Sequence, residues 1–319
     1  MAGNRMDKRE RSWVLYDVGN SAFFMFATTV APIYYGSLAV GSTVVGWGFT
    51  ETVAALIVAL LMPLLGSLAD YPKNKKKFFI GAVGTGAVAF AALGLPTTPL
   101  PFLIIYVVAA VGLNSSLVFY DAFLVDATKT ENYDSLSTKG YAWGYIGSLI
   151  PFGCCIAIMY GGSIIGIDLA TGTRIGFVVT AIWWALFAIP LIRNVHQTHF
   201  KPKVANPLKK SFIGLGHTVK TIVKDRRMLL FIIAFFCYID GVHTIIRMAT
   251  AFGTDLGIDS MQLILALIAT QVIAFPSALV FGMLARKAGT RKMLIVGVIA
   301  YALITLYAAF FLKSAAEFW

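Results

Sequence analysis

The sequence predicts an all-α integral membrane protein, and three observations support that prediction: the composition, nine long apolar segments, and the placement of basic residues. Hydrophobic residues make up 58% of the 319 residues, charged residues make up 13%, and the mean hydropathy is +0.79. Soluble domains contain about 45–50% apolar and about 25% charged residues. The chain is too apolar for that class.

Nine segments are long enough to cross a bilayer, which takes about 20 predominantly apolar residues in a helix. They are residues 13–40, 45–69, 78–95, 101–125, 138–160, 174–193, 229–252, 261–284 and 293–312. We expect the first segment to be retained, because it is longer than the apolar region of a signal peptide and lacks a clear small-residue cleavage site.

Basic residues gather on one side of the predicted topology. The chain has 26 lysines and arginines against 15 aspartates and glutamates, a net charge of +11, and 23 of the basic residues precede the first segment or lie in alternate connections. Cytoplasmic loops of membrane proteins carry such an excess. The N-terminus is therefore expected in the cytoplasm, and the charge does not indicate nucleic-acid binding.

A short motif occurs twice and indicates two related halves. Residues 66–77 and 282–292 both begin with Gly-x-Leu-Ala, continue with a charged residue, Asp70 or Arg286, and end in a basic turn. The longest polar stretch lies between the two copies. The sequence predicts an N-terminal six-helix half (1–193), a cytoplasmic linker (194–228) and a partial C-terminal half of three helices (229–319).

The first copy of the motif resembles the signature loop of the major facilitator superfamily, through Gly66, Ala69, Asp70 and the lysines that follow. The resemblance implies a conformational latch in which Asp70 pairs with the other half of a transporter. The expected latch residues are Gly66, Asp70, Lys75, Lys76, Arg286 and Arg291. The resemblance also implies twelve helices, so a chain with nine would be C-terminally truncated.

Two stretches resemble a narrower family, that of the autophagy-related vacuolar amino-acid effluxer and its bacterial relatives. They are Tyr16, Asp17, Asn20, Ser21 and Ala22 in the first segment, and Ala122 to Gly147 around the fourth connection. Val125 and Asp121 stand where that family is expected to have proline and asparagine. The resemblance covers residues 8–312 and implies a multi-pass protein of the bacterial inner membrane.

Four polar residues share one face of segment 229–252. Asp240, His243, Thr244 and Arg247 are separated by offsets of three, four and seven residues, which places them on one side of a helix. Ionisable residues in a membrane helix are costly unless they pair or face water. Two interpretations are open: the four residues line a solute path, or Asp240 and Arg247 form a structural brace.

The first and fourth segments also carry polar residues at membrane depth. Asp17 and Asn20 lie in the first segment, and Asn114 and Asp121 lie seven residues apart on one face of the fourth. Asp17 is either a carboxylate at the headgroup level or part of a path. In the superfamily the first, fourth and seventh helices surround the cavity, so the resemblance implies that these residues line it.

The residues and the resemblance together predict a secondary active transporter of a small polar solute, with an amino acid as the candidate, working by alternating access in the direction of efflux. Arg247 is expected to bind the solute carboxylate. Asp240 and His243 are candidates for proton coupling, because histidine changes charge near neutral pH. The alternative is a truncated or non-transporting membrane protein, or an assembly subunit of the same fold.

Other functions are not indicated. The sequence has no nucleotide-binding glycine loop, no nucleophile with a base and no metal-ligand cluster, so we expect no enzyme activity, cofactor or metal. The three cysteines do not suggest a disulfide. Expected partners are the solute, a proton, bilayer lipids, and a second copy or further helices that complete the fold.

Overall fold

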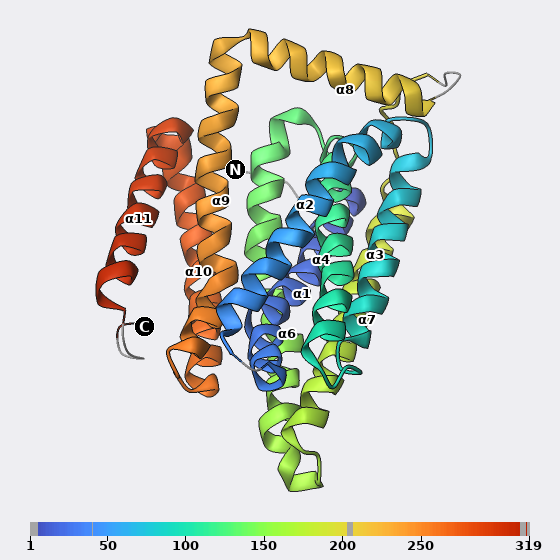
Figure 1. Cartoon of the computed structure of the whole chain (residues 1–319). Coiled ribbons are helices and arrows are strands. Elements are labelled where there is room, and N and C mark those ends of the chain that lie inside the picture. The colour runs from blue at the N-terminus through green and yellow to red at the C-terminus, as the bar shows by residue number, and fades with distance from the viewer. Residues whose placement is uncertain (1–5, 40, 203–206, 313–316, 318–319) are drawn as a thin grey trace.

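The computed structural model describes residues 6–39, 41–202, 207–312 and 317. This described part consists of helices and connections, without a strand (Figure 1). The α-helices are α1 (Lys8–Leu38), α2 (Thr43–Ala69), α3 (Asn74–Ala92), α4 (Pro99–Ala122), α5 (Leu124–Ala127), α6 (Tyr133–Gly161), α7 (Leu169–Asn194), α8 (Pro207–Lys224), α9 (Arg226–Asp255), α10 (Ser260–Ala288) and α11 (Thr290–Phe311). Two 3-10 helices, η1 (Thr130–Asn132) and η2 (Gly162–Ile165), flank α6.

Seven of the described helices are long and apolar enough to cross a membrane: α2, α4, α6, α7, α9, α10 and α11. They confirm the predicted class, an all-α multi-pass membrane protein. Two other predicted segments, 13–40 and 78–95, correspond to α1 and α3. These two helices are not among the seven. α1 is rich in tyrosine, threonine and serine, and α3, which has 19 residues, begins with a lysine run.

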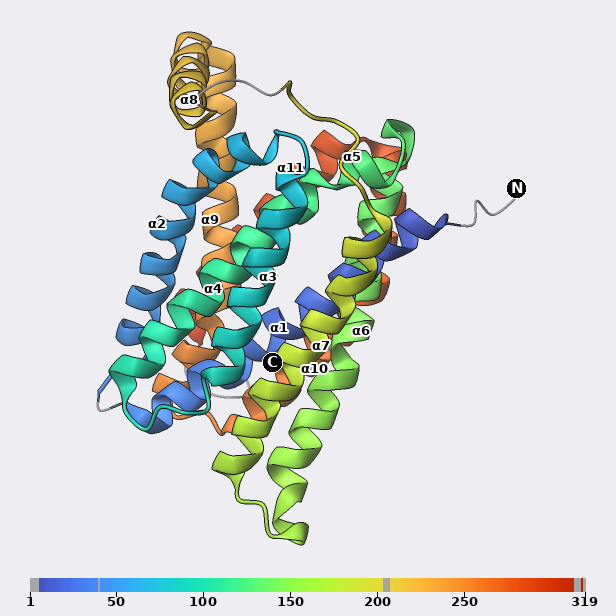
Figure 2. The same ribbon diagram turned by 90° about the vertical axis from the view of Figure 1, so that its right-hand side faces the viewer.

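An aromatic core orders the helices of the first part. In that part α1 lies against α6 and α7, and α3 lies against α4 and α7 (Figure 2). Phe26 of α1 meets Phe90 of α3 and Phe177 of α7 in edge-to-face contacts. Trp184 of α7 is fully buried, and its indole nitrogen donates to the Tyr16 hydroxyl at 3.2 Å. Such aromatic pairs contribute about 0.5–1.5 kcal/mol beyond their buried area.

Glycines allow the closest contacts between helices. A Cβ atom added to Gly112 of α4 would lie 2.5 Å from the Cα of Gly86 in α3, and one added to Gly147 of α6 would lie 2.4 Å from Val18 of α1. In lipid, close packing of backbones takes the place of a hydrophobic force between helices. The α3–α4 and α1–α6 contacts therefore depend on these glycines.

Helices α9 to α11 form the second part of the structure. α9 packs on α1 and α2, α10 packs on α6, and α11 packs on α10 and α9 (Figure 1). In α9 the buried residues, Thr250, Ala251 and Gly253, all lie near its C-terminal end. The second part therefore makes its closest α9 contacts at the end of the bundle opposite α8.

The connection after α7 folds back over the ends of α3 and α5. Asp126 of α5 has a fully buried side chain, which accepts hydrogen bonds from the Thr198 backbone nitrogen (2.8 Å), the Thr198 hydroxyl (2.6 Å) and Lys75 Nζ (2.9 Å). Burial acts to raise the pKa of Asp126, but the hydrogen bonds from Thr198 and Lys75 outweigh it and hold that pKa below its ordinary value. The linker expected at 194–228 is thus anchored at its start, and it contains an unexpected helix, α8.

We expect Gly112→Ala to lower the melting temperature of the purified protein in detergent. The new methyl group would meet backbone atoms of α3, which cannot rotate away, and overpacking of this kind costs about 1–3 kcal/mol. Gly84→Ala in α3 is the control, because a Cβ atom there has no neighbour within 4 Å. Equal melting temperatures for the two variants would contradict the close α3–α4 contact.

We expect Asp126→Asn to destabilise the protein at neutral pH, since it leaves the buried Lys75 ammonium without its counter-charge, a loss of about 3–5 kcal/mol. The folded-state pKa of Asp126 is depressed, so its stabilisation is present above its unfolded pKa, about 3.9, and is lost as the pH falls through the folded-state pKa.

The difference in melting temperature between wild type and Asp126→Asn should therefore narrow in acid. Asp134→Asn is the control, because Asp134 is an exposed carboxylate in the first turn of α6. A difference that stays the same from neutral to strongly acid pH would argue against an ionised Asp126 in the folded protein.

Candidate functional site

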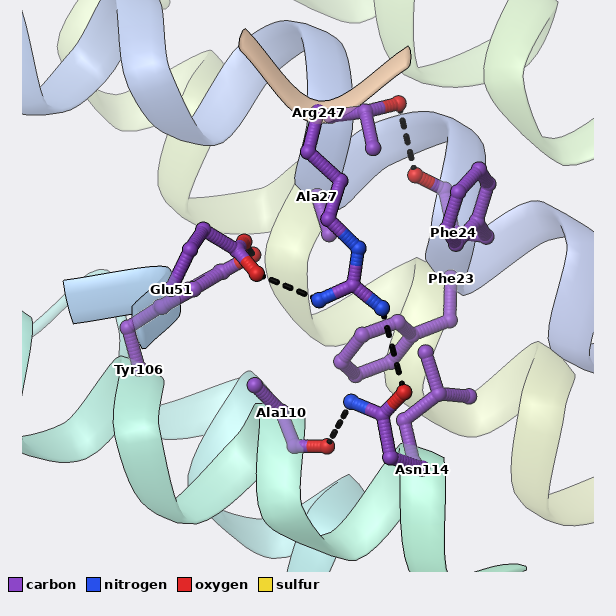
Figure 3. Close-up of a pocket in the computed structure, with 10 residues that line it drawn as sticks. Phe23, Phe24, Ala27, Glu51, Tyr106, Ala110, Asn114 and Arg247 are labelled. Carbon is purple, nitrogen blue, oxygen red and sulfur yellow. Dashed lines mark hydrogen bonds and ion pairs between the residues drawn. The ribbon is translucent and has the colours of Figure 1, made fainter. Parts of the chain in front are cut away.

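A polar site inside the bundle is formed by α2, α4 and α9 (Figure 3). One terminal nitrogen of Arg247 in α9 lies 2.5 Å from Oε2 of Glu51 in α2, and the other donates to Oδ1 of Asn114 in α4 at 3.1 Å. The Arg247 and Glu51 side chains are only 18% and 11% exposed. The ion pair therefore joins the second part of the structure to the first within its interior.

Neighbouring groups orient the two acceptors of Arg247. The Tyr106 hydroxyl donates to Oε1 of Glu51 at 2.5 Å, and the Asn114 amide donates to the Ala110 carbonyl at 2.7 Å. These bonds leave the second carboxylate oxygen of Glu51 and the amide oxygen of Asn114 directed at the guanidinium (Figure 3). An ion pair held in this way is costly to break from one side, by about 3–5 kcal/mol, because the remaining charge stays buried.

One nitrogen of the guanidinium, Nε, makes no hydrogen bond to the described residues. The Nε atom of Arg247 is buried and has no hydrogen-bond partner within the described chain. Arginine offers five N–H donors in a planar fork that matches a carboxylate or phosphate. The Nε–H group is therefore free to donate to a further polar group.

The space around the ion pair is small. Its volume is about 10 Å³, room for about one water molecule. The lining consists of Phe23, Phe24, Ala27, Thr28, Glu51, Tyr106, Ala110, Leu113, Asn114 and Arg247 (Figure 3). In this arrangement the site is too narrow for a solute larger than water, which would require the helices to move apart.

The other predicted residues of α9 lie outside this pocket. Asp240, His243 and Thr244 are on the exposed stretch of the helix that leads toward α8. Arg247 pairs with Glu51 of α2 instead of Asp240, so the brace that we considered between Asp240 and Arg247 is wrong. The spacing along α9 could not reveal this, because the carboxylate comes from another helix.

Asp17 and Asn20 form a second polar group in α1. Both are buried, and the Asn20 amide donates to Oδ1 of Asp17 and to the Tyr16 carbonyl, each at 3.1 Å. Asp121 of α4 is exposed, whereas Asn114 on the same helix bonds Arg247. Of the predicted path residues, Asn114 and Arg247 meet at the Arg247 site and Asp17 and Asn20 form this second group. Asp121, Asp240, His243 and Thr244 are exposed and belong to neither.

At the opposite end of the bundle from α8, a carboxylate links α9 to α2. Asp255, the last residue of α9, accepts hydrogen bonds from the Ser42 hydroxyl at 2.5 Å and from the backbone nitrogens of Thr43 (2.8 Å) and Val44 (3.3 Å). A carboxylate at a helix N-terminus is stabilised by the free N–H groups and the helix dipole. These hydrogen bonds hold α9 against α2 at this end of the interface.

The predicted latch residues have other partners than expected. The resemblance implied that Asp70 pairs with the second half, but Asp70 binds Lys201 of the connection after α7, at 2.7 Å between side chains and 2.8 Å between backbones. That connection folds back over the end of α2, which brings Lys201 to Asp70. Lys75 binds Asp126, and the Nζ atom of Lys76 lies 2.7 Å from Nδ1 of His196.

The remaining latch residues make few contacts. A Cβ atom at Gly66 would have open space around it, and Arg291 is exposed. The side chain of Arg286 lies outside the described residues.

Sequence reasoning missed Glu51. It is the sole charged residue of the predicted segment 45–69, and an ionisable residue in an apolar segment needs a partner or water. That rule would have found it, although not its pairing with Arg247. Within the described ranges, no group of three or more histidines, cysteines, aspartates or glutamates could hold a metal ion.

Known proteins resemble this chain at family level. A family model described as "Vacuole effluxer Atg22 like" matches residues 42–319. The uncharacterized MFS-type transporter YxiO of Bacillus subtilis is 41% identical over 326 residues, which cover 99% of this chain and 76% of YxiO.

Fungal relatives match over shorter stretches. Autophagy-related protein 22 of Coccidioides immitis is 23% identical over 284 residues, 66% of this chain and 45% of that protein. Autophagy-related protein 22-1 of Sclerotinia sclerotiorum is 28% identical over 160 residues, 46% of this chain and 27% of that protein. The chain thus spans about three quarters of YxiO and less than half of these fungal proteins. The long family match and the identity with YxiO confirm the resemblance seen in the motifs, and the chain belongs to the Atg22-like vacuole effluxer family of MFS-type transporters.

Proposed function

We propose that this chain is a secondary active transporter that moves a small polar solute bearing a carboxylate, such as an amino acid, by alternating access. The observation that carries the proposal is the buried contact of Arg247 with Glu51, which spans the two parts of the bundle. The names of its relatives, MFS-type transporter and vacuole effluxer, support the transporter class. Such a protein does no covalent chemistry, so the proposal includes no enzyme activity and no cofactor.

The proposed topology has nine membrane helices, with α1 and α3 added to the seven apolar ones, six before the connection and three after it. The basic connections gather at the end of the bundle that carries α8 (Figure 1). This placement supports a cytoplasmic N-terminus in a bacterial inner membrane. A second copy or further helices would cover the exposed face of α9.

In the proposed mechanism, Glu51 and the solute carboxylate compete for Arg247. Glu51 holds one terminal nitrogen of the guanidinium in the present arrangement, and the planar fork can bind a solute carboxylate in bidentate fashion once Glu51 withdraws. A proton taken up by Glu51 removes its negative charge and releases Arg247 to the solute. Solute and proton are then bound together, so the sum of their two gradients sets the net direction, and we propose efflux after the family description.

The access route we propose leads from the α8 end. Asp240, His243 and Thr244 are exposed on α9 toward that end, and Asp17, Asn20 and Asp121 lie toward it on α1 and α4. The opposite end is held by Asp255 on the N-terminus of α2. Asp240 and His243 would pass protons toward Glu51, since histidine exchanges protons near neutral pH.

We propose that Asp70 acts as a conformational latch, with Lys201 as its partner in the present state. The ion pair of Asp70 with Lys201 ties the end of α2 to the connection between the two halves. When the α8 end closes, Asp70 would exchange Lys201 for a basic residue of the α10–α11 turn, where Arg286 and Arg291 lie. The latch would then stabilise the outward-facing state and leave solute affinity unchanged.

The alternative is a non-transporting membrane protein or assembly subunit in which the polar site is a brace. One observation favours it: the ion pair is satisfied without a solute, in a space for about one water molecule. The two functions differ in whether the purified chain moves a solute across a membrane.

We expect proteoliposomes that contain the 319-residue chain to take up labelled amino acids in exchange for internal ones, and Arg247→Lys to reduce this exchange. Lysine keeps the charge but loses the planar fork, and hydrogen bonds to charged groups contribute about 1.5–3 kcal/mol. The exchange rate at low solute concentration should fall by about 10- to 100-fold. Arg193→Lys, an exposed arginine at the end of α7, should have no effect.

Two results would count against the proposal. An unchanged exchange rate in Arg247→Lys would show that Arg247 does not bind the solute. Absence of exchange in the wild-type chain, for every amino acid and small carboxylate in the panel, would favour the brace.

We expect Glu51→Gln to bind solute without dependence on pH and to lose uptake driven by a proton gradient. The neutral amide no longer competes for Arg247 and no longer carries a proton. Equilibrium binding at acid and alkaline pH, together with gradient-driven uptake, measures both effects. Glu131→Gln, an exposed glutamate of η1, is the control, and proton-driven uptake that survives in Glu51→Gln would assign the coupling to another group.

A further inference from the structure

Helix α8 has no role in the mechanism above, and its position is unusual. It ends at Lys224, and after the single residue Asp225 the chain continues as α9. α8 runs crosswise to α9, over the end of the bundle where α2 terminates (Figure 1). Figure 2 shows the same helix from its end, standing above the other helices. A helix attached to a membrane span in this way is held at the level of the membrane surface.

One face of α8 is apolar and uncovered. Phe212, Leu215, Val219, Ile222 and Val223 recur at intervals of three and four residues, which places them on one side of a helix. Phe212, Val219 and Val223 are 59%, 52% and 59% exposed, while Leu215 and Ile222 are half-buried toward the bundle. The described chain therefore leaves most of this apolar face without a partner.

The rest of α8 and its junction with α9 are strongly basic. Residues 207–227 contain six basic residues and one acidic residue. The acidic residue, Asp225, turns its carboxylate to the backbone nitrogens of Arg227 (2.9 Å) and Met228 (3.2 Å), where it caps α9. A shallow open depression at this corner is lined by Thr221, Lys224, Asp225, Arg226 and Arg227. The corner thus presents three cations and a hydroxyl around one space.

We propose that α8 lies in the headgroup layer of the cytoplasmic leaflet and binds anionic phospholipid, with its apolar face in the acyl region and a lipid phosphate at the corner of Lys224, Arg226 and Arg227. The inference rests on the proposed topology. An apolar face beside a lysine-rich face is typical of helices that lie in a membrane interface. Anionic lipids attract such clusters, and the long lysine side chains extend to the headgroups. The lipid is favoured over a protein partner because α9 enters the membrane directly after this corner.

The test uses the whole chain with Cys154, Cys155 and Cys237 replaced by alanine. Single cysteines, Val219→Cys on the apolar face and His217→Cys on the opposite face, carry an environment-sensitive dye. The protein is placed in nanodiscs that hold a fixed fraction of phosphatidylcholine with brominated acyl chains, while unbrominated phosphatidylglycerol replaces unbrominated phosphatidylcholine in increasing amounts. We expect quenching at position 219 to rise with phosphatidylglycerol and to exceed that at position 217 at least about twofold, because only the apolar face reaches the acyl region.

Removal of corner charges should weaken this response. Each basic residue near an anionic surface is worth about a fivefold change in affinity, so Lys224→Gln combined with Arg226→Gln should raise the phosphatidylglycerol content at half-maximal quenching. Lys292→Gln, an exposed lysine at the start of α11, should not change it.

Three results would overturn the inference. Equal quenching at the two positions would place α8 outside the acyl region. A position 219 shielded from both brominated lipid and aqueous iodide would mean that protein covers the face. Quenching at position 219 that does not change with the phosphatidylglycerol content would show that α8 does not bind anionic lipid. These readouts require no transport, so they can fail while amino-acid exchange succeeds, or the reverse.

Discussion

The arrangement of the bundle depends on the pairing of two charges that neither half could bury alone. Arg247 belongs to α9 and Glu51 to α2, and each would be costly inside a membrane protein without the other. Tyr106 and Asn114 complete the hydrogen bonding from α4. The two parts must therefore approach at this depth, and because both side chains are mostly buried, their attraction is stronger than it would be in water.

The same constraint explains how the two ends of α9 differ. At its C-terminal end, Asp255 satisfies free backbone donors of α2 and holds the two parts together. Toward α8, Asp240 and His243 are exposed and nothing in the described chain fastens α9 to α2 there in the same way. An interface that is held at one end and free at the other has the asymmetry that the proposed alternating access requires, because rocking about the central ion pair would exchange the two ends.

The sequence allowed the helices to be predicted but not all of their partners. Apolar length and alternate basic loops are local signals, so the membrane class and the helix positions could be read directly. The choice of Glu51 for Arg247, and of Lys201 for Asp70, depends on which helices and connections meet in space, which no spacing along one helix encodes. α8 was missed for another reason: its lysines resemble those of a linker, and only the helical period of the apolar residues between them indicates a helix.

The central ion pair also limits what the site can carry. In the proposed mechanism, exchange of Glu51 for a solute carboxylate replaces one anion by another, so Arg247 is not left unpaired, and the barrier is the motion of the helices. A solute without an anionic group would leave a buried guanidinium without a counter-charge, and sites built around a buried polar group reject ligands that cannot pair with it far more strongly than apolar pockets reject a misfit. The proposed mechanism therefore favours carboxylates over sugars or amines of the same size.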